Sequence, residues 1–296
     1  MIPNLSLGTA QFGLDYGVTN KKGKLTKDAI KKILLYAKKA DVQFLDTAQF
    51  YGDSEKVIGK SLPIDHKFKI CTKLTPLENV NIDLNLIETL ESNLKRSFDY
   101  LGQSCIDTFL IHRPSDLKGL YGEKIINWLT NLRNKKLVKN IGLSIYERKD
   151  LNFVPIDEFQ VIQLPLSVYD QRLIDDGTVD FLFNKKISIH CRSIFLQGLI
   201  LENPKNLPRF LSNKFYEFHL KNHKRFKDLD TTPLEVAINF IKQQKKIDNF
   251  IVGISSLKEF IEIHKIWITI GSKIKNLDYS QLAWKNNLDL DPRSWS

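Results

Sequence analysis

The 296-residue sequence is poor in the residues and motifs that most directly reveal a metal or disulfide protein. It has only three cysteines, Cys71, Cys105 and Cys191, which are far apart and odd in number. They form neither a disulfide framework nor a metal-binding pair, so we expect each to be a small buried hydrophobic residue in or beside a strand. The six histidines show no HxH or HExxH spacing, which argues against a metal hydrolase and predicts no metal site.

Long apolar runs are also missing. None reaches the roughly 18 residues that a membrane-spanning helix needs. The first four residues lack the basic region and the apolar core of a signal peptide, so we expect a cytoplasmic protein without a membrane partner. No low-complexity segment or change of composition marks a linker, which predicts a single domain over residues 1–296.

Charge of one sign is in excess. The chain has 44 Lys and Arg against 34 Asp and Glu, for a net charge of +10. Such an excess is typical of some nucleic-acid-binding proteins, but here the lysines are spread over many expected helices. We therefore interpret it as a solvated surface and expect no nucleic-acid partner. One alternative is a basic rim that attracts a phosphorylated cofactor or substrate. A further alternative is a nucleic-acid-binding site.

Eight short apolar runs alternate with helical patterns along most of the chain. In residues 26–40, for example, Ile30, Ile33, Leu34 and Ala37 share one helical face. Alternation of this kind is typical of parallel strands joined by right-handed crossovers. Eight such units in fewer than 300 residues predict an α/β fold, a (β/α)₈ barrel. The expected strands are 5–8, 44–46, 68–72, 106–111, 140–144, 161–165, 187–192 and 250–254.

One connection, residues 195–232, is too long for an ordinary loop between a strand and a helix. Phe215, Phe218, Lys221 and Phe226 have helical spacing, so we expect a helix within it. A lid or cofactor clasp and a purely structural insertion both agree with this pattern.

Polar side chains follow three neighbouring strands of the predicted barrel. Asp46 ends the second strand and Tyr51 lies in the loop after it; Lys73 ends the third strand and His112 the fourth. Because the carboxyl ends of barrel strands converge at one mouth, we expect these four side chains to lie together. Each alone has a structural interpretation, such as an ion pair or an aromatic cap, but the combination indicates an active site.

The combination is suited to protonating a carbonyl oxygen. A phenol ordinarily titrates near pH 10, and a nearby cation lowers its pKa, so we expect Lys73 to make Tyr51 a better proton donor. Asp46 would keep Lys73 charged and in place, and His112 would hydrogen-bond the substrate oxygen. None of these side chains is a good hydride donor, so a cofactor must supply the hydride.

At these residues the chain resembles the aldo-keto reductase superfamily. The similarity runs from Leu7-Gly8-Thr9-Ala10 to Phe250-Ile251-Val252-Gly253. Its most specific segments are Asp46-Thr47-Ala48, Tyr51-Gly52 and Ser54-Glu55. The resemblance implies NAD(P)H-dependent reduction of an aldehyde or ketone, with a sugar-related carbonyl compound as one candidate. It assigns Tyr51 as the general acid, Lys73 and Asp46 as the groups that tune it, and His112 as the orienting group. The alternative is a nucleotide-binding regulatory barrel with little turnover.

The resemblance also implies cofactor contacts. Gln163 matches a glutamine that holds the nicotinamide carboxamide, and Ser144 a serine beside it. Ile145 replaces the family's asparagine, and Arg192 stands where relatives often stack an aromatic ring on the nicotinamide. The other residues expected at the cofactor are Gly8, Thr9, Ala10, Ser193, Gly198, Gly253, Ser255, Ser256 and Glu259.

Glu259 bears on the choice of cofactor, because relatives often have arginine or glutamine there. Two interpretations stay open. Glu259 closes a capping box with Ser256, or it faces the ribose and disfavours the 2′-phosphate of NADP. The resemblance favours NADP as the cofactor, with NAD as the alternative.

Overall fold

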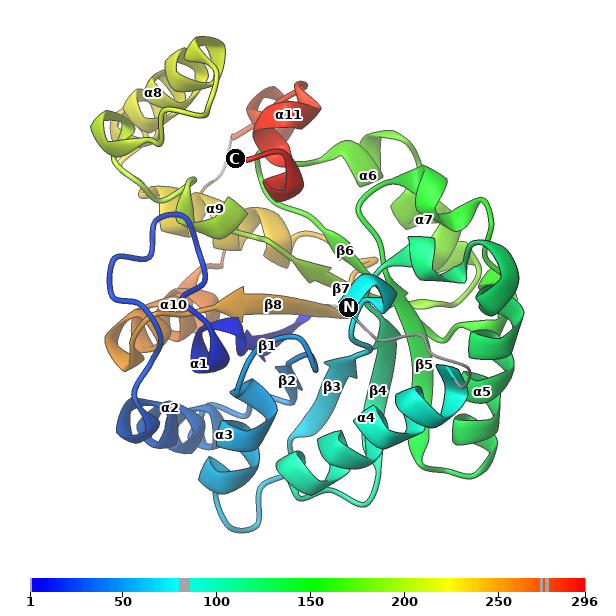
Figure 1. The fold of residues 1–296 in the computed structure, drawn as a ribbon. Helices are drawn as coiled ribbons and strands as arrows, with labels where there is room; N and C mark the ends of the chain where they lie inside the picture. The colour runs from blue at the N-terminus through cyan, green and yellow to red at the C-terminus, as the bar shows by residue number, and fades with distance from the viewer. Residues whose placement is uncertain (1, 80–85, 272–273, 275–276, 296) are drawn as a thin grey trace.

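Eight parallel strands form a closed barrel. A computed structural model describes residues 2–79, 86–271, 274 and 277–295. The strands follow one another in chain order around the barrel, and the last is hydrogen-bonded to the first (Figure 1). They are β1 (Asn4–Gly8), β2 (Phe44–Asp46), β3 (Lys69–Lys73), β4 (Ile106–Ile111), β5 (Val138–Ser144), β6 (Val161–Pro165), β7 (Ser188–Arg192) and β8 (Asn249–Gly253). The predicted (β/α)₈ barrel is confirmed, and each strand lies within two residues of its expected bounds.

Helices surround the barrel and bury one apolar face each. The longer ones are α2 (Lys27–Lys39), α3 (Ser54–Ser61), α4 (Leu86–Leu101), α5 (Gly122–Asn134), α7 (Thr178–Asn184), α8 (Asn213–Asp228), α9 (Pro233–Lys242) and α10 (Leu257–Thr269). In α2, Thr26 caps the helix by accepting a hydrogen bond from the Ala29 amide, and the four apolar residues predicted for one face are the buried ones. Amphipathic spacing therefore fixes which side of α2 meets the strands.

Short helices complete the connections. They are α1 (Ala10–Gly13), α6 (Arg172–Asp175) and α11 (Asn287–Leu290). The β5–β6 connection contains two 3₁₀ turns, η4 (Arg148–Leu151) and η5 (Ile156–Glu158), where the other crossovers contain a longer helix. This connection stays close to the barrel mouth, where η4 is packed against η2 (Pro114–Leu117) after β4.

The long connection between β7 and β8 contains the predicted helix. This helix, α8, lies on the outside of the barrel (Figure 1). Its His219 bonds the Tyr169 hydroxyl through Nδ1 (3.1 Å) and the Glu202 carbonyl through Nε2 (2.9 Å), and Phe218 packs on Trp284. The segment 195–232 therefore has two parts: its first residues lie at the barrel mouth, and its helix packs on the flank.

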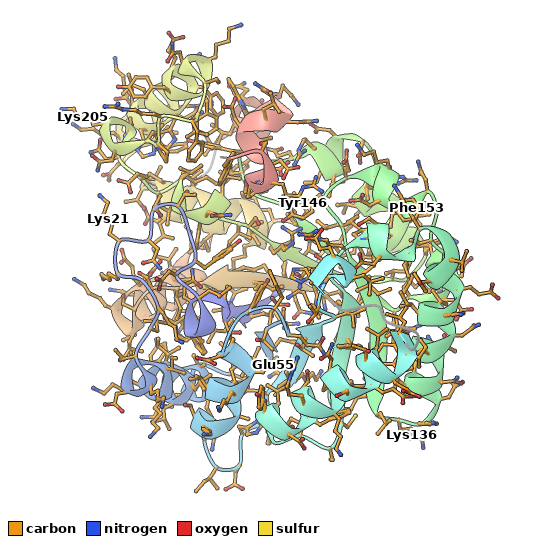
Figure 2. All side chains as sticks on the ribbon, in the orientation of Figure 1. Lys21, Glu55, Lys136, Tyr146, Phe153 and Lys205 are labelled. Atoms are coloured by element: carbon orange, nitrogen blue, oxygen red, sulfur yellow. The ribbon has the colours of Figure 1, made fainter. Side chains whose placement is uncertain are left out.

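Two predictions about surface and core can be compared with the structure. Lys21, Lys136 and Lys205 lie at widely separated places on the periphery, which is the scattered arrangement expected (Figure 2). Cys71 and Cys191 are buried as predicted, but Cys105 is only partly buried because it precedes β4. Among the described residues, no helix is long and apolar enough to cross a membrane, and no group of three or more His, Cys, Asp or Glu could hold a metal ion.

Candidate active site

A buried ion pair forms the centre of the barrel mouth. Lys73 at the end of β3 places Nζ 2.7 Å from Oδ2 of Asp46 at the end of β2, and both side chains are buried. Lys73 Nζ also donates to the Thr47 carbonyl (2.9 Å), and Gln163 Nε2 donates to the other Asp46 oxygen (2.7 Å). The strand ends thus converge as predicted, and the carboxylate holds the ammonium group in one position.

The loop that carries Tyr51 is held by two glycines. A Cβ on Gly13 would lie 1.8 Å from the Tyr51 carbonyl oxygen, and one on Gly52 would lie 2.6 Å from the Gly13 carbonyl oxygen. Gly52 also has a positive φ of 54°. Only glycine allows this close approach of two backbones, which places the Tyr51 ring with its centroid 5.1 Å from Lys73 Nζ.

His112 completes the predicted set of four. Its ring lies edge-on to the Tyr51 ring, with 5.9 Å between centroids. Its Nδ1 atom is buried and has no hydrogen-bond partner within the described part of the chain. A buried histidine nitrogen without a partner is uncommon in a purely structural role, so this atom is a candidate for contact with a ligand.

Burial determines the protonation of the phenol and the imidazole. It raises the pKa of Tyr51; Lys73 opposes the rise and Asp46 adds to it. The prediction of a net downward shift is therefore wrong here, although Lys73 acts in the predicted direction. Burial, together with Lys73, Arg192 and Arg113, lowers the pKa of His112 to about 3. Burial works to lower the pKa of Lys73, but Asp46 and Tyr51 outweigh it and raise that pKa overall. At neutral pH the site therefore holds a protonated phenol, a neutral imidazole and a charged ammonium group.

A first cavity opens beside Tyr51. Nine predicted residues line it: Gly8, Thr9, Ala10, Asp46, Tyr51, Arg192, Ser193, Gly198 and Gly253. Gln11 and Tyr16, which were not predicted, also line the first cavity. Burial, with the phenols of Tyr51 and Tyr146, raises the pKa of Tyr16, so its hydroxyl group stays protonated at neutral pH. No local pattern in the sequence marks these two residues.

Two loops meet across this first cavity. Thr19 in the loop after β1 donates a hydrogen bond to the Gln197 carbonyl in the loop after β7 (3.1 Å). In the latter loop Ser193, Leu196 and Gln197 have φ values of 60°, 49° and 52°, and Gly198 has 93°. Left-handed residues in such turns form backbone concavities that bind anions, so the loop is suited to a phosphate group.

Five predicted cofactor residues lie outside the lining of the first cavity. Ser144 and Gln163 are buried at the ends of β5 and β6, and Gln163 Oε1 has no partner among the described residues. Glu259, on α10, accepts hydrogen bonds at Oε2 from the Ser255 amide (2.7 Å) and hydroxyl (2.8 Å). Ser256 caps α10 by accepting from the Glu259 amide (3.2 Å). The expected capping box is therefore only half present, because the Glu259 carboxylate bonds Ser255 instead.

Arg192 stacks on a ring of the protein itself. Its guanidinium carbon lies 4.1 Å from the centroid of Tyr146, the residue after Ile145, and Nη2 donates to the Ile145 carbonyl (3.1 Å). Tyr146 was not recognised from the sequence. Its role depends on contacts between strand ends, which no local pattern marks.

A second cavity, of about 530 Å³, has His112 in its lining. Residues from the loops after β2, β3, β4 and β5 line it, together with Arg293 near the C-terminus. Tyr51 therefore faces the first cavity and His112 the second, and the two rings are in edge-on contact.

Comparison with known proteins gives a family match and similar folds. Residues 4–273 match the sequence profile of the aldo/keto reductase family. Aldo-keto reductase str7 from Strobilurus tenacellus is 32% identical over 224 residues, which are 71% of this chain and 62% of that relative, so the chain spans less than two thirds of its length. A glycerol dehydrogenase from Gluconobacter oxydans has a TM-score of 0.70 at 18% identity, over 95% of this chain and 89% of its own. A thermostable aldo-keto reductase in complex with the inhibitor epalrestat has a TM-score of 0.68 at 20% identity. The match covers 95% of this chain and 93% of that protein's chain. The two structural likenesses show the fold.

Proposed function

Because the chain belongs to the aldo/keto reductase family, we propose that it is a nicotinamide-dependent oxidoreductase that reduces an aldehyde or ketone to an alcohol. The observation that carries this proposal is the arrangement of Asp46, Lys73, Tyr51 and His112 where two cavities adjoin. A carbonyl oxygen within reach of both the Tyr51 hydroxyl group and the His112 ring would contact a proton donor and a hydrogen-bond donor at once.

In the proposed reaction Tyr51 gives its proton to the carbonyl oxygen. Its raised pKa keeps the phenol protonated at neutral pH, and Lys73 stabilises the phenolate that remains after the transfer. Asp46 keeps Lys73 charged through the 2.7 Å ion pair. Neutral His112 donates a hydrogen bond that orients the carbonyl oxygen. A nicotinamide cofactor supplies the hydride, which these side chains cannot.

The residues that line the first cavity, together with the buried Gln163, fit a nicotinamide nucleotide. Gln163 Oε1 is a buried acceptor without a partner in the described residues, and it suits the NH₂ group of a carboxamide. The loop at residues 193–198 suits the pyrophosphate. Gly253 keeps the cavity open near Gln11, because a Cβ there would lie 3.2 Å from Gln11 Nε2.

We further propose that NADH is preferred over NADPH, in contrast to the expectation from the resemblance. A helix N-terminus with free amides is a ready site for the 2′-phosphate of NADP. At the start of α10 the Glu259 carboxylate accepts hydrogen bonds from the Ser255 amide and hydroxyl. Its negative charge would repel the 2′-phosphate of NADP beside it.

The first experiment is titration of the protein with NADH and with NADPH, followed by tryptophan fluorescence or calorimetry. Saturable binding of either nucleotide supports the cofactor site, and tighter binding of NADH supports the role of Glu259. Aldehydes and ketones, including aldoses and glyceraldehyde, are then screened with the tighter nucleotide. Binding without turnover of any carbonyl compound would favour the regulatory barrel. Absence of binding at near-millimolar nucleotide would contradict the reductase.

A further inference from the structure

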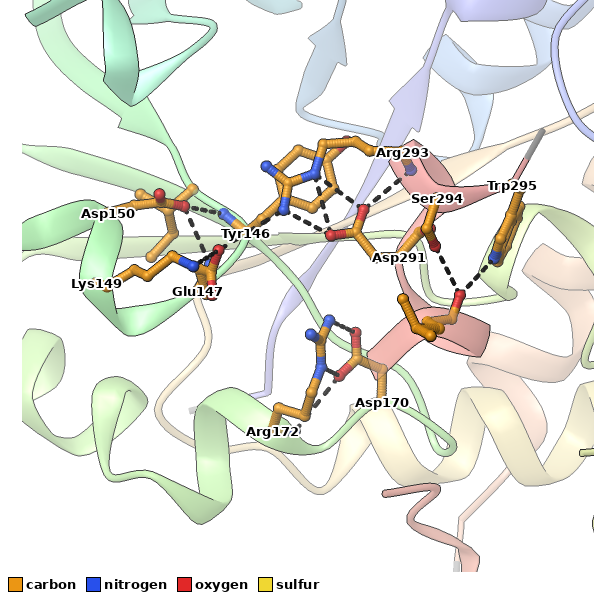
Figure 3. A network of polar contacts seen from close by, with 12 residues as sticks. Tyr146, Glu147, Lys149, Asp150, Asp170, Arg172, Asp291, Arg293, Ser294 and Trp295 are labelled. Carbon is orange, nitrogen blue, oxygen red and sulfur yellow. Dashed lines mark hydrogen bonds and ion pairs between the residues drawn. The ribbon is translucent and has the colours of Figure 1, made fainter. Parts of the chain in front are cut away.

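The side chain of Tyr146 lies between two guanidinium groups. Arg192 at the end of β7 stacks on one side with its guanidinium carbon 4.1 Å from the ring centroid. Arg293, in the 3₁₀ turn η9 (Pro292–Ser294), is 4.0 Å from the same centroid. Figure 3 shows Arg293 against Tyr146, with Asp291 beside it. The C-terminal residues thus contribute a cation to the barrel mouth.

Cations outnumber carboxylates in the lining of the second cavity. Arg113, Lys118 and Arg293 line it, against Asp150 alone. Asp150 is turned to the backbone, where its Oδ2 accepts from the amides of Tyr146 (2.8 Å) and Glu147 (3.1 Å). The lining has three basic residues to one acidic residue, whereas the whole chain has 44 basic to 34 acidic residues. This cavity is therefore more basic than the protein on average.

Two cations near the active site are not neutralised. Arg113 pairs with Glu78, and Arg293 Nη2 pairs with Asp291 (2.6 Å) and lies 3.9 Å from a Glu147 oxygen. Lys118 has no ion pair within the described ranges; its Nζ lies 4.5 Å from the Phe153 ring centroid. The side-chain hydrogen bonds of Arg192 go to two uncharged oxygens, the Ile145 carbonyl and the Ser193 hydroxyl. Lys118, in the lining of the second cavity, and Arg192, which stacks on Tyr146 of that lining, therefore keep their positive charge without a carboxylate partner in the described residues.

The catalytic histidine responds to this positive field. After burial, the groups that lower the pKa of His112 are Lys73, Arg192 and Arg113, all cations. Such a field attracts a negative charge on a ligand and holds the imidazole in its neutral form.

We propose that the substrate is an anionic carbonyl compound whose carboxylate or phosphate group is held by the unpaired Lys118, with Arg293 Nη1 as a hydrogen-bond donor, while its carbonyl group lies at Tyr51 and His112. This inference rests on the proposed reductase function. Arg293 donates hydrogen bonds to Asp291 through Nε and Nη2. Its Nη1 makes no hydrogen bond with the described residues. A cavity of about 530 Å³ holds a small, sugar-sized substrate.

The test compares two aldehydes of similar shape, para-carboxybenzaldehyde and the neutral para-nitrobenzaldehyde. Wild-type protein should show the higher kcat/KM with the carboxylate, and the ratio should fall as salt is added, because salt screens exposed charges. Lys118→Met should lower the ratio about 3- to 5-fold, the usual size of an exposed charge interaction. Arg293→Gln should lower it as well.

The control is Lys135→Met, which makes the same change of charge at the C-terminal end of α5, away from the mouth. It should leave the ratio unchanged. Preference for the neutral aldehyde, an unchanged ratio in Lys118→Met, or an equal fall in Lys135→Met would overturn the inference.

A binding measurement distinguishes failure of the anion site from failure of the reductase function. Dissociation constants of both aldehydes for the nucleotide-loaded Tyr51→Phe variant give the same charge comparison without turnover. If neither aldehyde is reduced but the carboxylate binds more tightly and loses this advantage in Lys118→Met, the reductase proposal fails while the anion site stands. If both are reduced without discrimination of charge, only the anion site fails.

Discussion

The barrel contains two buried polar clusters, and they differ in how completely they are bonded. In the lower interior His190 Nε2 lies 2.9 Å from Asn249 Nδ2, and Ser6 donates to the Asn249 oxygen (3.4 Å). At the mouth, Asp46 and Lys73 are paired, but His112 Nδ1 and Gln163 Oε1 have no partner in the described chain. An unpartnered buried polar atom costs about 1–3 kcal/mol, so the mouth cluster carries a cost that the lower one avoids.

The difference shows which property identifies a functional cluster. Burial lowers the pKa of His190 to about 4, with Asp46 and Asp248 opposing it, and that of His112 to about 3. A perturbed pKa is therefore common to both histidines. The unpartnered atoms beside a cavity occur at the mouth, and these mark the place where a ligand completes the bonding.

The largest expected effect is that of Tyr51→Phe on turnover. Loss of the general acid should lower kcat about 100- to 10,000-fold. Nucleotide dissociation constants and the melting temperature should stay close to wild type, because no hydrogen bond of the Tyr51 hydroxyl to another described residue would be lost. Steady-state kinetics, fluorescence titration and thermal unfolding measure the three quantities. Wild-type turnover by the variant would show that the proton comes from another group.

Lys73→Met should affect both stability and activity. The variant leaves the buried Asp46 carboxylate without its cation, although Gln163 Nε2 still donates to it, and breaking a buried ion pair costs about 3–5 kcal/mol of unfolding free energy. Denaturant titration measures the loss. The double variant with Asp46→Asn should regain much of the stability but not the activity, since no cation remains to stabilise the phenolate. Recovery of activity in the double variant would contradict the role of Lys73.

How far the sequence predicts each cluster depends on how local the determining contacts are. The strands, and the pair of Asp46 and Lys73, follow from apolar periodicity and from the rule that barrel strands end at one mouth. The bond from Gln163 to Asp46 does not, because it depends on a side-chain conformation chosen across the barrel. The upward shift in the pKa of Tyr51 was missed because burial is a property of the complete fold.

The contacts of Tyr146 with Arg192 and Arg293 show the same limit. Nothing in the local sequence of either arginine indicates a contact with Tyr146, and the stack exists only because β5, β7 and the C-terminal residues meet. The expected partner of Arg192 was a nicotinamide ring, on the basis of its position at the end of β7. Motif positions locate a residue on the barrel but do not specify its neighbours.

Acid should destabilise the protein through the lower cluster. His190 has a pKa of about 4 in the fold, against 6.5 for an ordinary histidine, so between these values the unfolded chain binds a proton that the folded protein does not. Stability therefore falls as the pH falls through this window, by up to about 1.4 kcal/mol per pH unit for one histidine. Denaturant titrations of His190→Gln, whose amide can still bond Asn249, should show a shallower pH dependence with unchanged kcat. An unchanged slope would mean that His190 is not held neutral by burial.

The smallest effect concerns the charge at α10, outside both clusters. Glu259→Gln removes the carboxylate that bonds Ser255 while keeping an oxygen acceptor, so the ratio of NADPH to NADH affinity should rise about 5- to 10-fold, the change for roughly one unscreened charge contact. The matched control is Glu262→Gln, one turn farther along the same helix and exposed. A shift confined to Glu259→Gln places the discrimination at the helix N-terminus. An equal shift in both variants would assign it to the general field of the helix, and no shift in either would remove Glu259 from the choice of cofactor.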